Sequence, residues 1–304
     1  MKPVVSLVVV SWECGDELAE LIESMRTHLP EAGEVELVVI DNASSVDPHG
    51  IVREWTGPVR FQRLDSNRGF GAASNAGVGL ASSPVCILCN PDVRLIDGSI
   101  LKLAEYALER NALVGPRLLW EDGTVQPSAS GPVTGIWPWI GAVIPGSLQP
   151  RWMQRKTEPW RLESTTEVTW LTGAVIAAPT ALLRELGPFD ESIELMSEDL
   201  DLGLRAGDAD VSLFFAPDLA KAIHIGGRSR KRRFADEGLE LAAANRMDVI
   251  ERFAGAGAAR RSSLAQKTRL RLRLAGKSLL GRDAAAERSE LQALSRSSAI
   301  RRSP

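Results

Sequence analysis

Acidic and amide side chains follow three separate apolar runs, at the point where each run ends. The runs end on Ser11-Trp12-Glu13, on Asp41-Asn42 and on Asn90-Pro91-Asp92. Carboxylate oxygens bind Mg²⁺ or Mn²⁺ together with substrate phosphates, so the pattern points to phosphate or nucleotide chemistry. Each stretch taken alone is also an ordinary turn sequence, because Asn, Asp and Pro favour turns. Three of them at one sheet edge favour a ligand site.

A second group of carboxylates lies far along the chain, in FDESIELMSEDLDLGLRAGD (189–208). Its four central members are Glu194, Glu198, Asp199 and Asp201. A solvated helix start would explain them, because carboxylates favour the first helical turn. The Met and Leu residues among them indicate a partly buried setting instead. Burial raises the pKa of a carboxylate, which can then serve as a general base.

Two further stretches carry candidate binding residues. NRGFGAASNAG (67–77) contains G-x-G but lacks the third glycine of the dinucleotide-binding spacing, so an NAD site is excluded. A helix start that approaches a diphosphate and a plain helix cap both remain open for it. His224, in KAIHIGGRS, is the one histidine of three expected at a strand-to-loop edge. It is either a structural residue or a metal ligand.

The elements that must position these residues alternate between strands and helices. Apolar, largely β-branched runs predict strands at 4–10, 35–40, 59–64, 85–89 and 168–179. Helices are expected after the first of these strands, with Asp16 as its cap, and over 97–110, 180–187 and the 197–208 region. This order predicts an α/β fold with a mostly parallel sheet and helices on both faces. Ligands bind such sheets at the carboxyl ends of the strands.

The chain changes in texture after about residue 120. Residues 123–150 carry no charge but several prolines, and five of the eight tryptophans lie between 137 and 170. Such a segment is predicted to be a long loop or a pair of short helices. From 236 onward the chain reads as helical, although KTRLRLRLAGKSLLGR (267–282) fits a strand or a helix equally well.

Charge is divided unevenly along the 304 residues. Residues 228–304 hold 19 Lys and Arg against 8 Asp and Glu, whereas the whole chain has a net charge of −3. A basic tail on an acidic body suggests contact with an anionic lipid surface or nucleic acid, although a solvated helical face explains it equally well. The acidic body and the lack of a basic–aromatic motif argue against nucleic acid.

Cysteine usage and hydropathy indicate the cellular compartment of the protein. Cys86-x-x-Cys89 lies inside an apolar run, where residues three apart point to opposite faces, so both thiols are expected in the core. The first residues lack the pattern of a signal peptide, and no window offers the ~20 apolar residues of a spanning helix. We expect a cytoplasmic protein, peripheral on the inner face of the cell membrane if the tail binds lipid.

Taken in order, four motifs resemble the family 2 inverting glycosyltransferases. They are SLVVVSWECGDEL, VVIDNAS, NRGFGAASNAG with LCNPDV, and GPFDESIELMSEDLDLGLR, and they span about residues 4–230. The resemblance implies a GT-A fold over 1–230, with a nucleotide-binding half (1–115), an acceptor-binding half (116–230) and a basic, mainly helical extension (231–304). The segment GPRLLWEDGTVQPSAS and the basic tail look most like the bacterial rhamnosyltransferases of cell-wall assembly.

The resemblance also implies a role for each matching residue. Asp199 would be the catalytic base, and Asp92 with His224 would bind Mg²⁺ or Mn²⁺. The first Asp of the family's D-x-D motif is Asn90 here, which leaves one carboxylate for the metal. The donor would contact Ser11, Trp12, Glu13, Asp41, Asn42, Arg68, Asn75 and Asn90. The acceptor would contact Trp170, Gly173 and Glu198.

The expected reaction is a single displacement that moves a sugar from a nucleoside diphosphate to an acceptor hydroxyl. Rhamnose from dTDP-rhamnose and a polyprenyl-diphosphate-linked sugar are the expected donor and acceptor, with a homodimer as a further expectation. Trp137 and Trp139 would lie at the headgroup level of a membrane. The alternatives are a UDP-sugar-dependent transferase of the same fold and a protein that binds nucleotide sugars or glycans without turnover.

Overall fold

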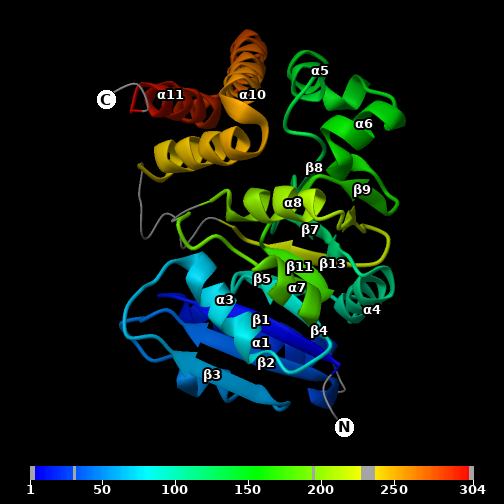
Figure 1. Cartoon of the computed structure of the whole chain (residues 1–304), viewed down its shortest axis with the longest axis vertical. Helices are drawn as coiled ribbons and strands as arrows, with labels where there is room; N and C mark the ends of the chain where they lie inside the picture. The colour runs from blue at the N-terminus through cyan, green and yellow to red at the C-terminus, as the bar shows by residue number, and fades with distance from the viewer. Residues whose placement is uncertain (1–3, 30–31, 194–195, 227–236, 301–304) are drawn as a thin grey trace.

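A twisted sheet of eight strands runs through the body of the protein (Figure 1). The computed structural model describes residues 4–29, 32–193, 196–226 and 237–300. The strand order is β3-β2-β1-β4-β11-β6-β12-β9, and the first four strands are parallel. The strands are β1 (Val5–Ser11), β2 (Val35–Asp41), β3 (Val59–Arg63), β4 (Val85–Cys89), β6 (Leu113–Gly115), β9 (Thr166–Val168), β11 (Val175–Pro179) and β12 (Leu213–Phe215). The predicted α/β fold with a mostly parallel sheet is confirmed.

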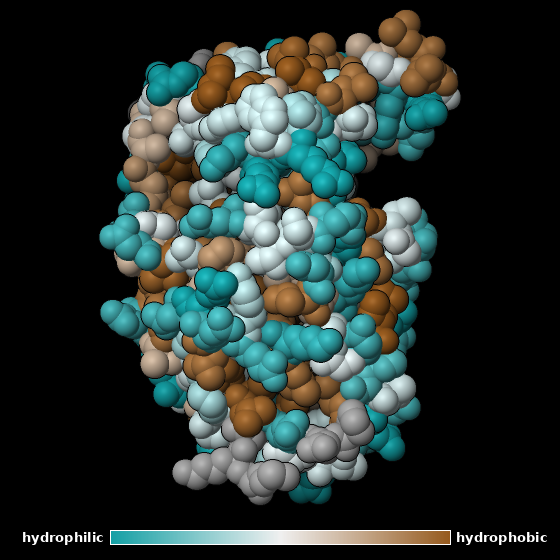
Figure 2. Space-filling model, turned by 90° about the vertical axis from the view of Figure 1, so that its right-hand side faces the viewer, coloured by the Kyte–Doolittle hydropathy of each residue, from teal (hydrophilic) through white to brown (hydrophobic). Residues whose placement is uncertain are grey.

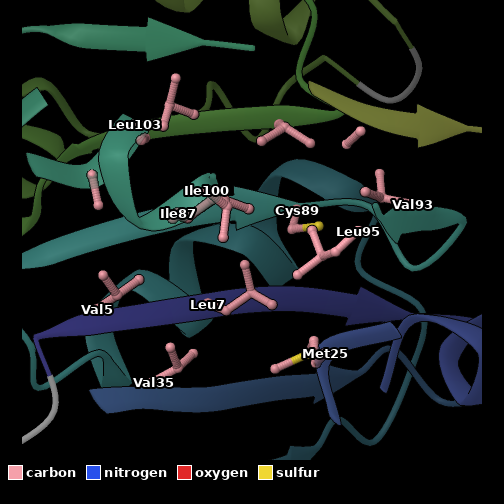
Figure 3. Close-up of a cluster of buried hydrophobic side chains, with 14 of the residues drawn as sticks. Val5, Leu7, Met25, Val35, Ile87, Cys89, Val93, Leu95, Ile100 and Leu103 are labelled. Carbon is pink, nitrogen blue, oxygen red and sulfur yellow. The ribbon is translucent and has the colours of Figure 1, made fainter. Parts of the chain in front are cut away.

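Helices cover both faces of this sheet because alternate strand residues point to opposite sides. The helices α1 (Gly15–His28) and α4 (Ile100–Arg110) pack on one face, in a cluster that includes Leu7, Ile87 and Cys89. Figure 3 shows part of this cluster, with Met25 of α1 and Ile100 of α4 beside the strands. The helices α3 (Phe70–Leu80), α7 (Thr180–Leu186) and α8 (Glu198–Asp208) pack on the other face, with Val8 and Cys86.

The two thiols of Cys86 and Cys89 therefore lie in different layers of the core, as predicted. Both side chains are buried and neither forms a disulfide. Burial raises the pKa of the Cys86 thiol to about 12, and it raises that of Cys89 as well. Neither thiol is suited to redox chemistry, which needs an accessible thiolate.

Close packing of α3 on the sheet depends on Gly77. A Cβ atom at this position would lie 2.4 Å from Cγ1 of Val8, so only glycine allows the helix to approach β1 at this distance. The first turn of α3 is thereby held beside the carboxyl ends of β1 and β2. Gly77 of the NRGFGAASNAG stretch has this packing function whether or not the loop also binds a diphosphate.

Two smaller sheets carry segments that the sequence patterns described less well. One has the order β5-β13-β7 and is formed by β5 (Val93–Leu95), β7 (Arg117–Leu119) and β13 (Lys221–His224). The other pairs β8 (Ala129–Ser130) with β10 (Trp170–Leu171). The single strand predicted over 168–179 is wrong, because the chain leaves the main sheet after β9 and re-enters it only at β11. The interruption at 172–174 forms part of the candidate site.

The proline- and tryptophan-rich segment forms short helices, the second of the two predicted alternatives. They are α5 (Trp137–Val143), η2 (Gly146–Leu148), α6 (Arg151–Thr157) and η3 (Pro159–Arg161). One local prediction near the N-terminus is wrong, because the cap position of α1 is Cys14 and Asp16 lies inside the first turn. The one-turn helix α2 (His49–Val52) follows β2.

The C-terminal region is mainly helical in its described part, 237–300, with a break at 280–284. It consists of α10 (Glu237–Leu279), interrupted at Gly255 (φ +80°), and α11 (Ala285–Ile300). Residues 267–279 of the stretch that fitted strand or helix equally well belong to α10. This helix packs on α5, α8 and α11, and its first segment lies directly above α8 in Figure 1. Within the described chain, no helix has the length and hydrophobicity needed to cross a bilayer.

Candidate active site

The carboxyl ends of β1 and β2 are locked together side by side. Ser11 and Asp41 are paired in the parallel register, and the Asn42 N–H donates to the Ser11 carbonyl at 2.8 Å. Both loops then turn through left-handed backbone conformations at non-glycine residues, Glu13 (φ +49°) and Ala43 (φ +63°). Such conformations cost free energy and concentrate at ligand-binding sites. The predicted convergence of these two strand ends is confirmed.

Side-chain hydrogen bonds hold these two loops in a fixed shape. Asp41 is fully buried, accepts a hydrogen bond from Ser44 Oγ at 2.5 Å and lies 3.4 Å from Nε of Arg63. The carboxylate of Glu13 accepts hydrogen bonds from the N–H and hydroxyl of Ser45. Ser11 Oγ lies 3.5 Å from the Cys14 thiol, which also accepts the N–H of Trp12. The acidic groups predicted to contact the donor thus also stabilise the loops around it.

Asn42 fixes the loop that leads into α3. Its side chain accepts the Arg68 N–H at 2.9 Å and donates to the Asn67 side chain and the Gly69 carbonyl. The Arg68 guanidinium extends to Glu191, at 3.2 Å. These contacts hold Arg68 beside the carboxyl end of β2, next to the acidic segment that precedes α8.

Asn75 connects α3 to the same acidic segment. Its amide donates to the Phe189 carbonyl at 2.9 Å and to Glu191 at 3.1 Å, while its Oδ1 accepts the Phe189 N–H at 3.0 Å. The side chain therefore holds residues 189–191 against α3. This packing role was missed in the sequence, and the donor contact expected of Asn75 stays a prediction.

The third strand end brings Asn90, Asp92 and His224 together. β4 ends at Cys89, and β13 places His224 opposite Val93 in antiparallel register. His224 Nε2 lies 3.3 Å from Asp92 Oδ1 and 3.4 Å from Asn90 Nδ2. The two predicted metal ligands, Asp92 and His224, thus converge with Asn90, which was predicted to contact the donor, although 132 positions separate Asp92 from His224 in the sequence.

Neighbouring groups orient both proposed metal ligands. His224 Nδ1 lies 2.8 Å from Gln126 Oε1, and Asp92 Oδ2 accepts the Gly226 N–H at 3.0 Å. When the Nδ1–H of His224 donates to Gln126, the other ring nitrogen, Nε2, faces Asp92. Nε2 then either carries a proton or offers a free lone pair. Burial acts to raise the pKa of Asp92, but the hydrogen bond and charge of His224 and the Gly226 N–H outweigh it and lower that pKa. Asp92 is therefore ready to hold a cation as a carboxylate.

These residues fit a divalent cation only in part. Among the residues that the structure describes, no group of three or more His, Cys, Asp or Glu side chains could hold a metal. Asp92 and His224 offer two ligand atoms 3.3 Å apart. This separation resembles the spacing of roughly 3 Å between adjacent ligands of an octahedral ion with ~2.1 Å bonds. Donor phosphates and water would have to complete the coordination, as is usual for such ions.

The predicted base, Asp199, lies in the first turn of α8 and is held by main-chain donors. Its Oδ2 accepts the Gly173 N–H at 2.9 Å, and its Oδ1 accepts the Leu200 N–H at 2.8 Å. Met196 (φ +53°) and Ser197 (φ +79°) precede it in left-handed conformations. The strained entry into α8 directs Asp199 toward the interrupted strand at 172–174. Glu194 of the acidic cluster lies outside the described residues.

Asp199 and Glu198 are neighbouring carboxyls in a low-dielectric setting. Burial raises the pKa of Glu198 to about 8, and the charge of Asp199 contributes to this shift. Burial also raises the pKa of Asp199, against the opposing effect of the Gly173 and Leu200 N–H groups. Glu198 Oε2 is inaccessible and has no hydrogen-bond partner among the described residues. We therefore assign the negative charge of the pair near neutral pH to Asp199, because the donors surround it and not Glu198.

The three predicted acceptor residues surround this base. Trp170 lies on β10, and its half-buried indole N–H is near enough to Asp199 to lower the pKa of that carboxyl. Its geometry does not meet that of a hydrogen bond to any described residue. A Cβ at position 173 would lie 3.4 Å from the Cβ of Asp199, so residue 173 must be small. Trp170, Gly173 and Glu198 are thus all brought close to Asp199.

The metal-side and base-side groups share one edge of the sheet. The Asn90 N–H donates to the Ala174 carbonyl at 2.9 Å, and the adjacent Gly173 N–H donates to Asp199. Cys89 at the end of β4 is opposite Val175 at the start of β11. The loops that carry Asp92 and Asp199 are therefore connected through residues 173–174, although their side chains come from opposite halves of the domain.

Sequence reasoning missed one charged residue beside the base. Arg246 of α10 is half-buried, and its charge interacts with those of Asp199 and of Glu290 in α11. Burial lowers its pKa, and the two carboxylates act in the opposite direction. No sequence signal distinguishes this arginine, because it is one of 19 basic residues in the C-terminal tail. Ser44 and Gln126, which orient Asp41 and His224, were also missed, because their residue types and spacing are ordinary.

Comparison with known proteins agrees with this geometry. The model of the family described as glycosyl transferase family 2 matches residues 6–174, which is more than half of the chain. The chain belongs to glycosyl transferase family 2. As a family 2 member it is a glycosyltransferase, and the match covers the β1, β2 and β4 strand ends together with Gly173.

Relatives and solved structures support the same assignment. An N-acetylglucosaminyl-diphospho-decaprenol L-rhamnosyltransferase of Mycobacterium tuberculosis is 29% identical over 270 residues, which cover 82% of this chain and 84% of that protein. The mannosyltransferase PcManGT of Pyrobaculum calidifontis, solved with GDP-Man and Mn²⁺, aligns with a TM-score of 0.59 at 15% identity, over 99% of this chain and 87% of that one. S. aureus TarS 1–349, solved with UDP-GlcNAc, aligns with a TM-score of 0.53 at 17% identity. The alignment covers 89% of this chain and 71% of that one. The likeness to these structures confirms the expected GT-A fold.

Proposed function

We propose that this glycosyltransferase moves rhamnose from dTDP-rhamnose to the sugar of a polyprenyl-diphosphate-linked acceptor, with inversion at the anomeric carbon. The choice of donor and acceptor is supported by the relative named as a rhamnosyltransferase, which aligns over most of both chains. The observation that carries the inverting mechanism is the single charged carboxylate, Asp199, held by Gly173 on the acceptor side of the sheet edge. One base is sufficient for an in-line displacement.

The displacement needs one proton transfer and one bond exchange. Asp199 accepts the proton of the acceptor hydroxyl as that oxygen attacks the anomeric carbon. The bond from the anomeric carbon to the diphosphate oxygen breaks, and its electron pair leaves with the nucleoside diphosphate. A divalent cation held by Asp92 and His224 would supply charge stabilisation for this leaving group. The raised pKa of Asp199 makes it a stronger base than an exposed aspartate.

Donor recognition would fall to the loops that follow β1, β2 and β4. The locked Ser11–Glu13 and Asp41–Asn42 loops would form the wall for the nucleotide base and ribose, with Arg68 directed at the phosphates. Arg68 is about half exposed and pairs with Glu191, so a diphosphate could replace this surface ion pair at little cost. The division into a donor half (1–115), an acceptor half (116–230) and an extension (231–304) follows from this assignment.

We also propose that the α5–α6 region meets an anionic membrane surface, as a lipid-linked acceptor would require. Ile136, Val143, Leu148 and Trp152 have exposed fractions between 60% and 75%. Arg151 and Arg155 lie one turn apart on α6 and line a cavity of about 210 Å³ with Arg161. Neither Arg151 nor Arg155 forms an ion pair within the described part of the chain. Such a mixture of apolar and basic side chains suits an interfacial helix.

The exposed tryptophan of this region differs from the two singled out in the sequence. Trp137 and Trp139 are only partly exposed, whereas Trp152 is 62% exposed. Figure 2 views this side of the molecule and shows apolar side chains next to hydrophilic ones over its upper end. If the region binds lipid, Trp152 and Leu148 would enter the headgroup layer. The protein would then be peripheral on the inner face of the membrane, with no spanning segment required.

Donor choice and stereochemistry test the proposed function directly. Thermal stabilisation by dTDP-rhamnose, UDP-GlcNAc and GDP-mannose should be compared with Mg²⁺ and with Mn²⁺. The selected donor should then be incubated with a short-chain polyprenyl-diphospho-GlcNAc, and the anomeric configuration of the product measured by NMR. Selective stabilisation by dTDP-rhamnose and an inverted product are expected. A selective response to a UDP sugar would replace the donor, and binding without any transfer would favour a non-catalytic role.

A further inference from the structure

The surroundings of Asp199 contain an excess of buried polar atoms without partners. Six buried side-chain N or O atoms among the described residues lack a hydrogen bond, and three of them lie near this base: Ser128 Oγ, Trp170 Nε1 and Glu198 Oε2. Ser128 is adjacent because its carbonyl accepts the Thr172 N–H at 2.9 Å. Buried polar atoms in native proteins are nearly always hydrogen-bonded. Their clustering indicates a position that a polar ligand completes.

Helix α10 forms a wall of this position. Its residues Val249, Ile250 and Phe253 pack with Trp170 and with Leu200 of α8 in one apolar cluster. Arg246 precedes Val249 by three residues and Ile250 by four, so it lies on the same face of α10. This face is turned toward α8, because its Val249 and Ile250 share a cluster with Leu200 of α8. Arg246 therefore borders the group of unpaired atoms.

Arg246 differs from the other arginines that connect α10 to the domain. Arg252 forms ion pairs with Asp190 at 2.6 Å and Asp201 at 3.3 Å, and Arg269 pairs with Glu158 at 2.7 Å. Within the described residues, Arg246 forms no hydrogen bond or ion pair that meets distance criteria, although it is near enough to Asp199 and Glu290 for their charges to interact. A partly buried guanidinium in this situation is suited to an incoming anion.

We propose that Arg246 binds the phosphate attached to the acceptor sugar, so that α10 completes the acceptor site. The inference rests on the proposed function, in which the acceptor carries a diphosphate. Asp199 must reach a hydroxyl of that sugar, so the phosphate on its anomeric carbon lies about one ring away from the base. Arginine binds phosphate through two parallel hydrogen bonds, which fix orientation as well as charge. The Trp170 Nε1–H and the Glu198 carboxyl would then be available to hydrogen-bond the neutral hydroxyls of the acceptor sugar.

A paired-acceptor experiment separates this role from an electrostatic effect on the base. Wild type, Arg246→Gln, Arg246→Lys and the surface control Arg260→Gln of the same helix are assayed with two acceptors. One is a short-chain polyprenyl-diphospho-GlcNAc and the other is the alkyl glycoside of GlcNAc, which lacks phosphate. Arg246→Gln should raise KM for the diphosphate acceptor about tenfold or more, as expected for loss of a charged hydrogen bond. Its KM for the alkyl glycoside should stay within about twofold of wild type.

The remaining outcomes each decide a different question. Arg246→Lys should recover part of the affinity for the diphosphate acceptor, which also tests the role if the Gln variant folds poorly. Equal losses with both acceptors, accompanied by a shifted pH profile of kcat, would overturn the inference, because Arg246 would then act only on the ionisation of Asp199. Wild-type transfer to both acceptors with equal KM would also overturn it while leaving the proposed function intact. Failure of wild type to use either acceptor would remove the proposed function and this inference together.

Discussion

Asp199 and Gly173 form the contact that joins α8 to the interrupted strand, with 2.9 Å between Oδ2 and the main-chain nitrogen. A main-chain donor at this position stabilises the carboxylate and sets its direction at the same time. Because residue 173 has no side chain, the loop approaches Asp199 without obstruction. The Ala174 carbonyl next to it accepts the N–H of Asn90, so the base is positioned relative to the loop that carries Asp92.

Replacing Asp199 by Asn should abolish proton transfer while preserving this contact. The amide oxygen of Asn can still accept the Gly173 N–H, but it cannot take a proton. We expect kcat to fall by about 10²–10⁴-fold, with the donor dissociation constant unchanged. Steady-state kinetics and donor titration measure the two quantities.

Asp201 supplies the matched control for Asp199, two residues further along α8. It is fully buried and pairs with Arg205 at 2.7 Å and Arg252 at 3.3 Å. Asp201→Asn should lower the free energy of unfolding and leave kcat of the folded enzyme close to wild type. If Asp199→Asn kept normal turnover, another residue would have to be the base.

Glu198 should make the stability of the protein depend on pH. Its folded-state pKa is about 8 against an ordinary value of 4.5, so the folded chain keeps this proton where the unfolded chain loses it. Stability from this group is fully present below pH 4.5 and declines as pH rises toward 8. Glu198→Gln removes the decline, so its free energy of unfolding relative to wild type should increase from pH 5 to pH 8. Urea unfolding at several pH values, with Glu185→Gln as a surface control, measures this; parallel curves for wild type and Glu198→Gln would contradict it.

Asn90 should limit the affinity of the proposed cation site. Its Nδ2 lies 3.4 Å from His224 Nε2, so Asn90→Asp would place a second carboxylate beside Asp92 and His224. We expect tighter Mn²⁺ binding in the presence of nucleoside diphosphate, and lower stability when no cation is added, because the two carboxylates repel each other. Calorimetric titration with Mn²⁺ measures the affinity, and Asp92→Asn is the variant expected to lose it. Unchanged Mn²⁺ affinity in both variants would locate the cation elsewhere.

Arg151 and Arg155 should control attachment to anionic lipid. Changing both to Glu lowers the net charge beside the exposed Trp152 by four units. Recovery of the protein with phosphatidylglycerol vesicles in flotation should therefore fall sharply. Arg53→Glu, on the surface of the proposed donor half, is the control for charge reversal at a remote position and changes the net charge by two units. Wild type should float less with neutral phosphatidylcholine vesicles and at high salt. Equal recovery of the wild type and Arg151→Glu/Arg155→Glu proteins would exclude this surface as the lipid contact.

The sequence was sufficient to predict the four parallel strands of the main sheet, because buried parallel strands leave a strong signal. The short strands β6 and β12 were not predicted. The runs at Val5–Ser11, Val35–Asp41 and Val85–Cys89 are buried throughout and largely apolar, and the polar residues that end them meet at one edge as expected. The resemblance of the motifs to family 2 then assigned Asp199 and Asp92 to opposite sides of one reaction. Both steps depend on local sequence patterns, which can be recognised without knowledge of tertiary packing.

Other features depend on contacts that no local pattern reveals. The predicted strand over 168–179 fails because Gly173 turns out of the sheet to meet Asp199, a residue 26 positions away. Asn75 contacts Phe189 across more than a hundred residues, and Gln126 orients His224 over a similar separation. Arg246 lies in a weakly patterned helix whose position above α8 follows from tertiary packing. Such supporting residues have ordinary types and spacings, so only the folded structure identifies them.

The attachment of α10 to α8, with no comparable packing on β1, β2 or β4, divides the enzyme into two parts that can diverge separately. If the proposed sites are correct, recombination of the C-terminal segment between relatives would exchange the proposed acceptor wall, while the proposed nucleotide wall near the N-terminus would stay unchanged. A single ancestral fold could in this way acquire new acceptors while its binding site for the activated sugar stays unchanged.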